Sequence, residues 1–200
     1  MLTMSHHRKH ELPSQGFTLP IRLATPEDVG GIARVHVEGW RNTYPGVVPD
    51  TFLRNLSLEA SAYRWQGVIA SQKKGVGRTL VAEHPHHGVV GFIGVGPQRT
   101  SLSGFSGEFY ALYVLDAFQG QGIGRALLTA GAAELRRRGN RTGLSWVLDG
   151  NPGRWFCERL GGVQVAQRML EVGDARLPEV AYGWTDLVPL ARLWEGAGVR

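Results

Sequence analysis

Residues 108–128 read EFYALYVLDAFQGQGIGRALL, an apolar segment followed by a glycine-rich turn and a second apolar segment. Aromatic and β-branched residues up to Val114 predict a strand, and the apolar spacing after the turn predicts a helix. Gly120, Gly122 and Gly124 let a ligand approach the backbone closely, because they carry no Cβ. The first turn of such a helix has unpaired N–H groups and a partial positive charge. The stretch therefore predicts a loop that holds an anionic group such as a pyrophosphate.

Two other glycine-rich motifs fit these residues less well. A P-loop has a lysine directly after its last glycine, and no lysine follows here. A dinucleotide-binding fingerprint needs G-x-G-x-x-G or G-x-G-x-x-A, but Leu127 takes the last place when the motif starts at Gly122. Asp149, at the end of the next predicted strand, stands roughly where such folds carry a ribose-binding acid. A dinucleotide-binding protein therefore stays open as a less favoured alternative.

The composition is that of a soluble globular protein with one domain. The chain has 200 residues, of which 42% are hydrophobic and 20% are charged. Its single cysteine, Cys157, excludes an intramolecular disulfide framework and any C-x-x-C motif. The net charge of +5 favours anionic ligands, but the arginines are dispersed apart from the run at 136–138. We therefore expect no nucleic-acid partner.

The polar N-terminus and the histidine-rich segments predict neither export nor a metal site. Residues 1–18 lack the apolar core of a signal peptide and are expected to form a disordered tail. No apolar run approaches the ~20 residues that span a bilayer, so we expect a cytoplasmic protein without membrane contact. Neither the tail nor a predicted hairpin turn has the ligand spacing of a structural zinc site, although the two segments contain His6, His7, His10, His84, His86 and His87.

Outward from the quoted stretch, hydrophobic periodicity predicts an α/β domain over residues 19–188 and a C-terminal tail over 189–200. The predicted helices are 25–40, 50–56, 57–69, 122–138 and 152–160. The predicted strands are 19–23, 78–83, 89–95, 108–114, 143–148, 164–172 and 180–187. Period-two alternation along the strand 108–114 predicts one face with Glu108, Tyr110 and Leu112 and an opposite face with Phe109, Ala111 and Tyr113.

Gln119, Gly122 and Gly124 form the pattern Q-x-x-G-x-G, which resembles the acyl-CoA loop of the GNAT superfamily of N-acetyltransferases. The string ALYVLDAFQGQGIGRALL is similar to the family's fourth strand, loop and third helix, and LSWVLDGNPGRWFCERLGG to its fifth strand and following helix. WRNTYPGVVP and VAYGWTDL resemble its first-helix and last-strand regions. The resemblance implies an α/β (α+β) fold with a central, mostly antiparallel sheet of about seven strands. It also implies a splay between the fourth and fifth strands and about four flanking helices.

The resemblance implies acetyl transfer from acetyl-CoA to a primary amine by direct attack, without a metal. The acceptor is then a small-molecule amine or a peptide N-terminus, and homodimers are common in the family. The strand backbone would bind the pantetheine arm, an amide near Val114 would face the thioester oxygen, and Asn151 would contact the cofactor arm while it caps the next helix. The implied cofactor-binding residues are Leu112, Tyr113, Val114, Gln119, Gly120, Gln121, Gly122, Ile123, Gly124, Arg125 and Asn151.

Glu108 is the expected base, because many family members carry an acid at the start of this strand. A free amine has a pKa near ~10, so at neutral pH less than about one molecule in a hundred is unprotonated. Cys157 stands where the family often has a tyrosine that protonates the leaving thiolate. A cysteine with a pKa near ~8.5 can donate this proton, and water and Tyr182 are alternative donors.

The departure at Cys157 leaves a second function open. In this alternative the chain is a catalytically weak module that senses acyl-CoA or supports a partner. The acceptor itself is not identified by the sequence, since one fold serves many substrates. The resemblance places the substrate walls at Trp40–Pro49 and Gly173–Trp184, whose aromatic and charged residues suit many amines.

Overall fold

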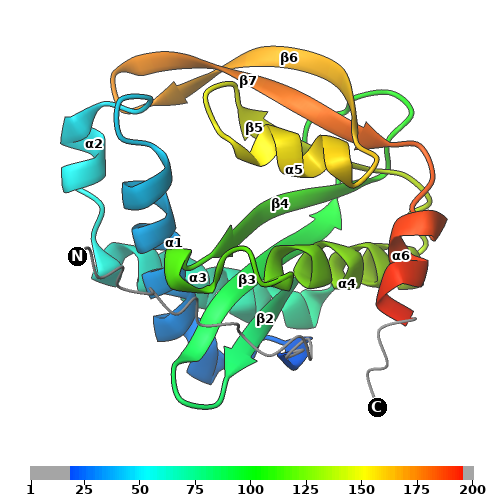
Figure 1. The fold of residues 1–200 in the computed structure, drawn as a ribbon, viewed down its shortest axis with the longest axis horizontal. Coiled ribbons are helices and arrows are strands. Elements are labelled where there is room, and N and C mark those ends of the chain that lie inside the picture. Colours follow the sequence, from blue (N-terminus) through cyan, green and yellow to red (C-terminus); the bar gives the residue numbers. More distant parts are fainter. Residues whose placement is uncertain (1–18, 196–200) are drawn as a thin grey trace, which may run out of the picture.

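A seven-stranded sheet runs through residues 19–195, the part of the chain that this computed structural model describes (Figure 1). The strand order is β1-β2-β3-β4-β5-β7-β6, and every neighbouring pair is antiparallel except β4–β5. The predicted mixed, mostly antiparallel sheet of about seven strands is therefore confirmed. The strands are β1 (Ile21–Leu23), β2 (Arg78–His84), β3 (Gly88–Pro97), β4 (Gly107–Val114), β5 (Gly143–Leu148), β6 (Val163–Val172) and β7 (Ala175–Trp184).

The parallel pair β4–β5 is short and opens into a gap. Its register contains two pairs, Gly107 with Gly143 and Glu108 with Leu144, and the strands separate beyond them (Figure 1). Just past the last pair, Ser145 Oγ donates to the carbonyl oxygen of residue 109 at 3.3 Å. The predicted splay between these two strands is confirmed. It leaves backbone groups of both strands without a ladder partner, which favours occupation of the gap by a ligand.

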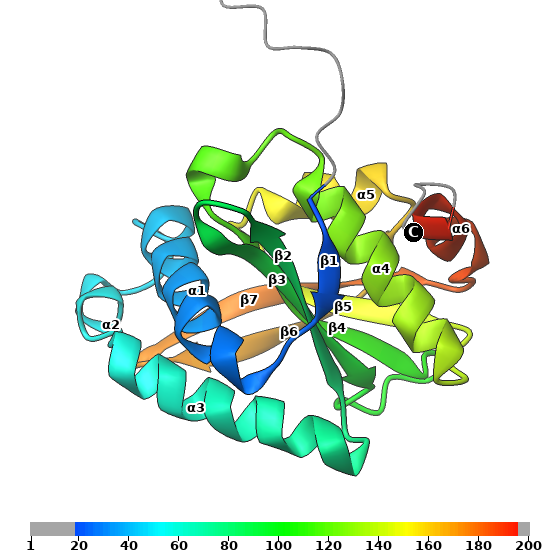
Figure 2. The ribbon, with the colours of Figure 1, turned by 90° about the horizontal axis from the view of Figure 1, so that it is seen from below.

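Helices cover both faces of the sheet (Figure 2), and residues 19–195 contain six α-helices where the resemblance implied about four. On one face, a Cβ added to Gly39 of α1 would lie 2.7 Å from the Tyr113 ring, and Trp65 of α3 packs on Phe92. On the other face, a Cβ added to Gly131 of α4 would lie 2.9 Å from Ile93, and Phe156 of α5 packs beside Gly124 of α4. The described helices are α1 (Val29–Thr43), α2 (Asp50–Arg54), α3 (Leu58–Ser71), α4 (Ile123–Arg137), α5 (Gly153–Arg159) and α6 (Val188–Glu195), with 3₁₀ turns η1 (Pro26–Asp28), η2 (Gln72–Lys74) and η3 (Asp116–Phe118).

A β-bulge in β4 overturns the predicted alternation along this strand. The register with β3 skips Tyr110, because Gly94 pairs with residue 111 and Val95 pairs with residue 109. One extra residue shifts every later side chain to the opposite face. Leu112 therefore lies beside α4, on the same face as Phe109, while Tyr113 lies against α1. Period-two counting cannot foresee this, since the extra residue is specified by pairing with a distant strand.

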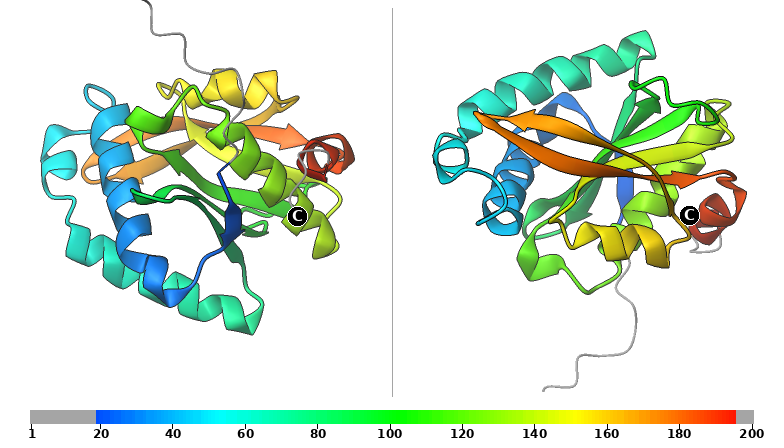
Figure 3. Two further views of the ribbon diagram at one scale, coloured as in Figure 1. Left: turned by 60° about the horizontal axis from the view of Figure 1, so that its bottom comes forward. Right: turned by 90° about the horizontal axis from the view of Figure 1, so that it is seen from above.

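The β6–β7 hairpin is longer and turns more tightly than predicted. Val172 pairs with Ala175, so β7 starts directly after a two-residue turn rather than near residue 180. Gly173 has a φ of 63°, which a turn of this kind requires and which glycine adopts at little cost. The tip of the hairpin reaches the α2 side of the molecule (Figure 3), where Gly173 lies against Phe52 of α2.

The C-terminal segment contains a packed helix where the sequence suggested a tail. Leu190 and Ala191 of α6 are buried, and α6 packs along α4. The predicted domain end at 188 is therefore too early, because burial of this apolar face continues the main core. The predicted tail 1–18 and residues 196–200 lie outside the described residues. Within residues 19–195, no helix has the length and apolar character needed to cross a membrane.

A second, smaller apolar cluster links the α1–α2 segment to the far end of β5 and to the β6–β7 hairpin. Its buried members are Tyr44, Val48, Leu53, Leu148 and Val172. The contact fixes the last turn of α1 and the loop up to Pro49 beside the gap, where the helix continues to Thr43, three residues beyond its predicted end. One wall of the space next to the β4–β5 gap is therefore part of the folded core.

Candidate active site

The glycine-rich loop between β4 and α4 leaves the first turn of α4 open. Gly120 and Gly122 have φ angles of 72° and 84°, and a Cβ added at either would meet nothing within 4 Å. Glycine is therefore needed here for the backbone conformation and not for packing. The first hydrogen bond of the helix runs from Ala126 N to Gly122 O. The amides of Ile123, Gly124 and Arg125 have no acceptor among the described residues, as the start of a helix leaves them.

Two glutamine side chains hold the loop in this conformation. Gln119 Nε2 donates to Val114 O at 3.0 Å and to Asp116 Oδ1 at 3.1 Å, and Gln121 Nε2 donates to the carbonyl oxygen of residue 117 at 3.1 Å. Gln119 thus ties the loop to the end of β4. Arg125 is exposed in the first turn of α4. Open amides, a helix N-terminus and a nearby guanidinium suit a phosphate group, and no group of the loop fills the space above the glycines.

Two predicted cofactor-binding residues, Gly124 of α4 and Leu112 of β4, meet Phe156 of α5 on the α4 side of the gap. A Cβ added to Gly124 would lie 3.6 Å from Phe156 of α5 and 3.9 Å from Leu112 of β4. Cys157, the next residue of α5, is buried with 6% of its surface exposed. Burial, with a smaller effect of Glu158, raises the pKa of its thiol to about 12. The thiol is therefore protonated at neutral pH and a weak proton donor.

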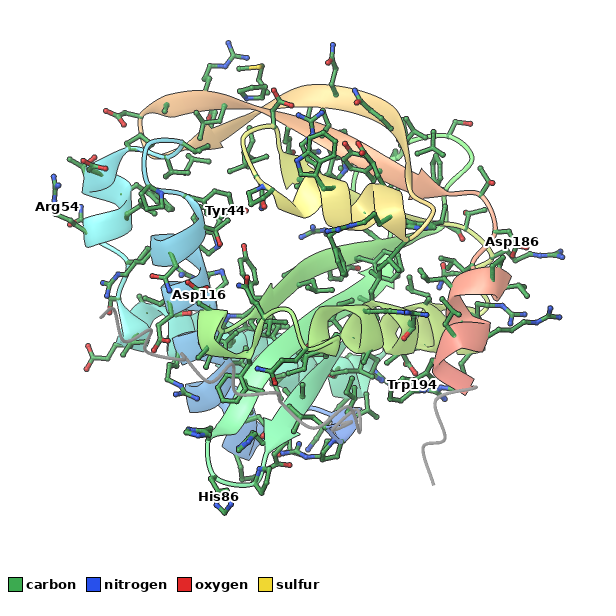
Figure 4. The ribbon with its side chains drawn as sticks, viewed as in Figure 1. Tyr44, Arg54, His86, Asp116, Asp186 and Trp194 are labelled. Atoms are coloured by element: carbon green, nitrogen blue, oxygen red, sulfur yellow. The ribbon has the colours of Figure 1, made fainter. Side chains whose placement is uncertain are left out.

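Asn151 joins the start of α5 to the end of α1. Its Oδ1 accepts from the N–H of Gly153, the first residue of α5, at 2.7 Å, but the N-cap position is Pro152 and not Asn151 as predicted, because the helix starts one residue later. Its Nδ2 donates to the hydroxyl of Tyr44 at 2.6 Å, and Tyr44 projects from the α1 side toward the middle of the molecule (Figure 4). Burial raises the pKa of the Tyr44 hydroxyl. Sequence reasoning placed Tyr44 in a substrate wall but not in contact with Asn151, because the two residues are far apart in the chain.

An uncharged aromatic cluster lies on the face opposite α4. Tyr113 stacks edge-on against His36 at 5.5 Å between ring centroids, and Trp40 lies 4.9 Å from Tyr44. Burial raises the pKa of Tyr113 well above its usual value, and burial followed by Arg64 lowers the pKa of His36 to about 4. Both side chains are therefore neutral near pH 7.

Glu108, the expected base, is covered by an arginine that the sequence did not single out. The carboxylate is 1% exposed. Its Oε2 accepts from the backbone N–H of Arg99 at 2.8 Å, and its Oε1 accepts from Arg99 Nε at 3.1 Å and Nη2 at 2.5 Å. The Arg99 side chain remains 60% exposed. A buried carboxylate requires such a partner, but the loop that supplies it gives no sequence signal of this pairing.

Asp149, the acid that left a dinucleotide-binding protein as an alternative, forms an ion pair with Arg154 in the first turn of α5. Within residues 19–195, no three His, Cys, Asp or Glu side chains are grouped so that they could hold a metal ion.

Comparison with known proteins agrees with this geometry. Residues 75–161 match the family model of the acetyltransferase (GNAT) domain. The chain is 38% identical over 173 residues to YuaI of Bacillus subtilis, an uncharacterized N-acetyltransferase, and the match covers 86% of this chain and 96% of YuaI.

Solved structures share the fold. The ribosomal-protein-alanine N-acetyltransferase of Brucella melitensis has a TM-score of 0.64 at 26% identity, with 83% of this chain and 99% of that chain covered. The structure of yncA from Salmonella typhimurium, solved with its cofactor acetyl-CoA, has a TM-score of 0.62 at 24% identity, with 84% and 94% covered. YuaI is similar to this chain over nearly its whole length, the family model matches, and the α4 N-terminus is open beside the gap. This chain therefore belongs to the GNAT family of acetyltransferases.

Proposed function

We propose that the protein transfers an acetyl group from acetyl-CoA to the primary amine of a small molecule or a peptide N-terminus. The observation that carries the proposal is the open first turn of α4, which stands beside the gap between β4 and β5. Acetyl-CoA supplies the acetyl group as an activated thioester. The gap offers unpaired strand backbone to its arm, and the loop offers unpaired amides to its phosphates.

The proposed cofactor-binding set is the one that the resemblance implied. The loop and the first turn of α4 would hold the pyrophosphate, with Arg125 adding a positive charge. The backbone of Leu112, Tyr113 and Val114 would bind the pantetheine arm along the open edge of β4. Asn151 would contact the same arm from the β5 side, in addition to its contact with Tyr44.

Glu108 is the proposed proton acceptor for the ammonium of the acceptor. It stands next to the point where β4 and β5 separate, on the face opposite α4. Both carboxylate oxygens bind Arg99, so the proton reaches Glu108 through a water molecule at the edge of this pair. A positioned general base typically contributes about 10²–10⁴-fold to the rate.

The proposed donor of the proton to the leaving thiolate is water. Cys157 stands at the family's tyrosine position, but its raised pKa makes proton release from the thiol unfavourable. The hydroxyl of Tyr182 donates to Glu158 Oε1 at 2.7 Å and accepts from Arg154 Nε at 3.2 Å, so it is already engaged on α5. A thiolate is a stable leaving group and does not depend on a fixed acid.

The test combines ligand binding and turnover. Thermal unfolding is followed with acetyl-CoA, CoA and NAD, and thiol release is followed with acetyl-CoA and a panel of primary amines. We expect the CoA compounds to raise the melting temperature while NAD leaves it unchanged, and at least one amine to accelerate thiol release. Stabilisation by acetyl-CoA without thiol release from any amine would instead support an acyl-CoA-binding module of little activity. No stabilisation by either CoA compound would overturn the proposal.

A further inference from the structure

Two buried glutamates on the face opposite α4 are each covered by an arginine. Glu108 of β4 is 1% exposed and Glu179 of β7 is 4% exposed. Arg99 binds Glu108 as described above, and Arg168 of β6 donates from Nε to Oε1 of Glu179. The two arginine side chains remain 60% and 41% exposed. Each pair therefore keeps its negative charge inside and presents its positive charge outward.

Each of these guanidinium groups also rests on an aromatic ring. Arg99 Cζ lies 4.2 Å from the centroid of the Tyr110 ring, and Arg168 Cζ lies 4.1 Å from that of Trp146. Trp146 Nε1 donates to the hydroxyl of Thr100, the residue after Arg99, at 3.3 Å. The two arginine–glutamate pairs are thus connected through this contact, although they come from the β3–β4 loop and from the β6–β7 hairpin.

The two pairs stand on opposite sides of the β4–β5 gap. Tyr110 belongs to β4 and Trp146 to β5, and both lie beyond the last pair of the ladder, Glu108 with Leu144. Paired residues of neighbouring strands point to the same face, and residues two apart along a strand do so as well. Trp146 therefore shares the face of Glu108, and Tyr110 lies there too, against Gly96 of β3. This face is opposite α4, so a second reactant that reaches the gap from it passes both arginines.

Guanidinium groups held in this way are prepared to bind a carboxylate. Within residues 19–195, Nη1 and Nη2 of Arg168 have no hydrogen-bond partner, since Glu179 binds Nε alone. Nη1 of Arg99 likewise has no partner there, since Glu108 binds Nε and Nη2. The remaining N–H groups form the planar donor arrangement that matches a carboxylate. Ion pairing and stacking have already restricted both side chains, so binding costs little further conformational entropy.

We propose that the acceptor is an amine that also carries a carboxylate, and that Arg99 and Arg168 bind this carboxylate. The inference rests on the proposed acetyl transfer and adds the chemical class of its acceptor. An amine without an anionic group would bring its ammonium toward the outward positive charge of both pairs, which is unfavourable. A carboxylate on the same molecule reverses this interaction and orients the amine toward the gap.

The competing interpretation is that both arginines only neutralise buried glutamates. In that case the charge of the acceptor is irrelevant to its turnover. The two interpretations differ in their response to matched acceptors, namely a series of 2-amino acids and the primary amide of each one. Both members of a pair carry the same side chain and a primary amine, and they differ in the carboxylate.

The experiment measures kcat/KM for each acid and its amide with the full-length enzyme and saturating acetyl-CoA. We expect the enzyme to favour the acids by tenfold or more. The double variant Arg168→Gln/Glu179→Gln leaves no unpaired buried charge, so we expect it to fold. Its kcat/KM should fall about 10–100-fold for the acids, as the loss of a hydrogen bond to a charged group predicts. For the amides, kcat/KM should fall less than threefold. Arg168→Lys tests the planar donor arrangement, because it keeps the charge, and Arg192→Gln on α6 is the control that should change neither value.

Each outcome decides between the interpretations. Equal or better turnover of the amides by the unmodified enzyme, or a double variant that keeps its preference for acids, would overturn the inference while acetyl transfer stands. Turnover confined to amines without an acidic group, or binding of acetyl-CoA without turnover of any acid in the series, would also overturn it. If acetyl-CoA neither binds nor is consumed with any amine, the proposed acetyl transfer itself fails, and this result is distinct from the others.

Discussion

At the scale of single residues, the candidate site depends on whether a buried ionisable side chain has a partner for its charged form. Glu108 is enclosed by Arg99, and Cys157 is enclosed by apolar neighbours of α5 and the core. The carboxylate keeps partners for both oxygens, while the thiol has its charged form penalised by burial. The two residues that the sequence predicts for proton transfer therefore differ in how well the protein stabilises their charged forms.

Replacing Glu108 with glutamine tests the base. We expect kcat at neutral pH to fall by about 10²-fold or more, as loss of a positioned general base predicts, with little change in acetyl-CoA affinity. The loss should shrink at high pH, where the amine is already unprotonated. A pH–rate profile measures this, and thermal unfolding checks that glutamine still occupies the site beside Arg99. A wild-type rate across the whole pH range would remove Glu108 from the mechanism.

Replacing Cys157 with alanine tests the need for a fixed acid. We expect kcat to fall by less than about tenfold, since a thiol with a pKa of about 12 is a poor donor and water can protonate the thiolate. Cys157→Tyr restores the family's usual residue but adds volume at a buried position, which costs about 1–3 kcal/mol of stability if the core does not adjust. A hundredfold loss in Cys157→Ala, with normal folding and acetyl-CoA affinity, would make Cys157 an essential acid.

At the scale of elements, α4 is the helix whose two ends have different chemical roles. Its N-terminus has three amides without an acceptor among the described residues, and its last turn carries Arg136 and Arg137. Basic residues near a helix C-terminus interact favourably with the partial negative charge there. The run of arginines is thus explained by the helix, while the open N-terminus is available for a ligand.

An aspartate at Gly122 should abolish acetyl-CoA binding, because its carboxylate would stand where the pyrophosphate is expected. Gly139→Asp is the matched control. It lies just beyond the other end of the same helix, has a φ of 86° and also has nothing within 4 Å of an added Cβ. Both variants therefore carry a similar backbone strain. Calorimetry should detect no binding to Gly122→Asp and near-normal binding to Gly139→Asp, and equal affinities in the two would contradict the proposed phosphate loop.

At the scale of the whole molecule, stability should depend on pH through a histidine on α1. The folded protein holds His36 neutral, with a pKa of about 4 against a usual value of 6.5. As the pH falls below about 6.5, the unfolded chain binds a proton at this position and the folded chain does not. The free energy of unfolding should therefore decrease, by on the order of 3 kcal/mol at pH 4 relative to pH 7.

The variant His36→Gln isolates this contribution, because glutamine does not titrate and can still hydrogen-bond Ser61. Urea unfolding at pH 7 and pH 4.5 gives the loss of stability for each protein. We expect the variant to lose less stability than the natural chain. Parallel losses in both proteins would show that His36 is not the group responsible.

The expected homodimer and cytoplasmic location stay predictions, and sedimentation of the full chain would test the first of them.

The sequence by itself determined the strand–loop–helix unit, the element order and the family. These features are local, since glycine spacing, apolar periodicity and short-range bonds such as that of Asn151 to Gly153 act within a few residues of the chain. The same reasoning correctly placed a glycine-rich loop between β4 and α4, and its role in binding acyl-CoA stays a prediction. It also ended the domain too early, because the amphipathic helix α6 is short and its burial depends on the distant helix α4.

Only the tertiary structure decided which side chains face each other across the sheet. The bulge at Tyr110 reverses the faces of Leu112 and Tyr113, because register is set by pairing with β3 and not by the strand's own pattern. The Arg99–Glu108 and Arg168–Glu179 pairs form across the turns that join neighbouring strands, and the contact of Tyr44 with Asn151 joins segments far apart in the chain. Buried charges need partners at hydrogen-bond distance, and which residues supply them is fixed when the strands pair, since neither partner has a local signal that identifies the other.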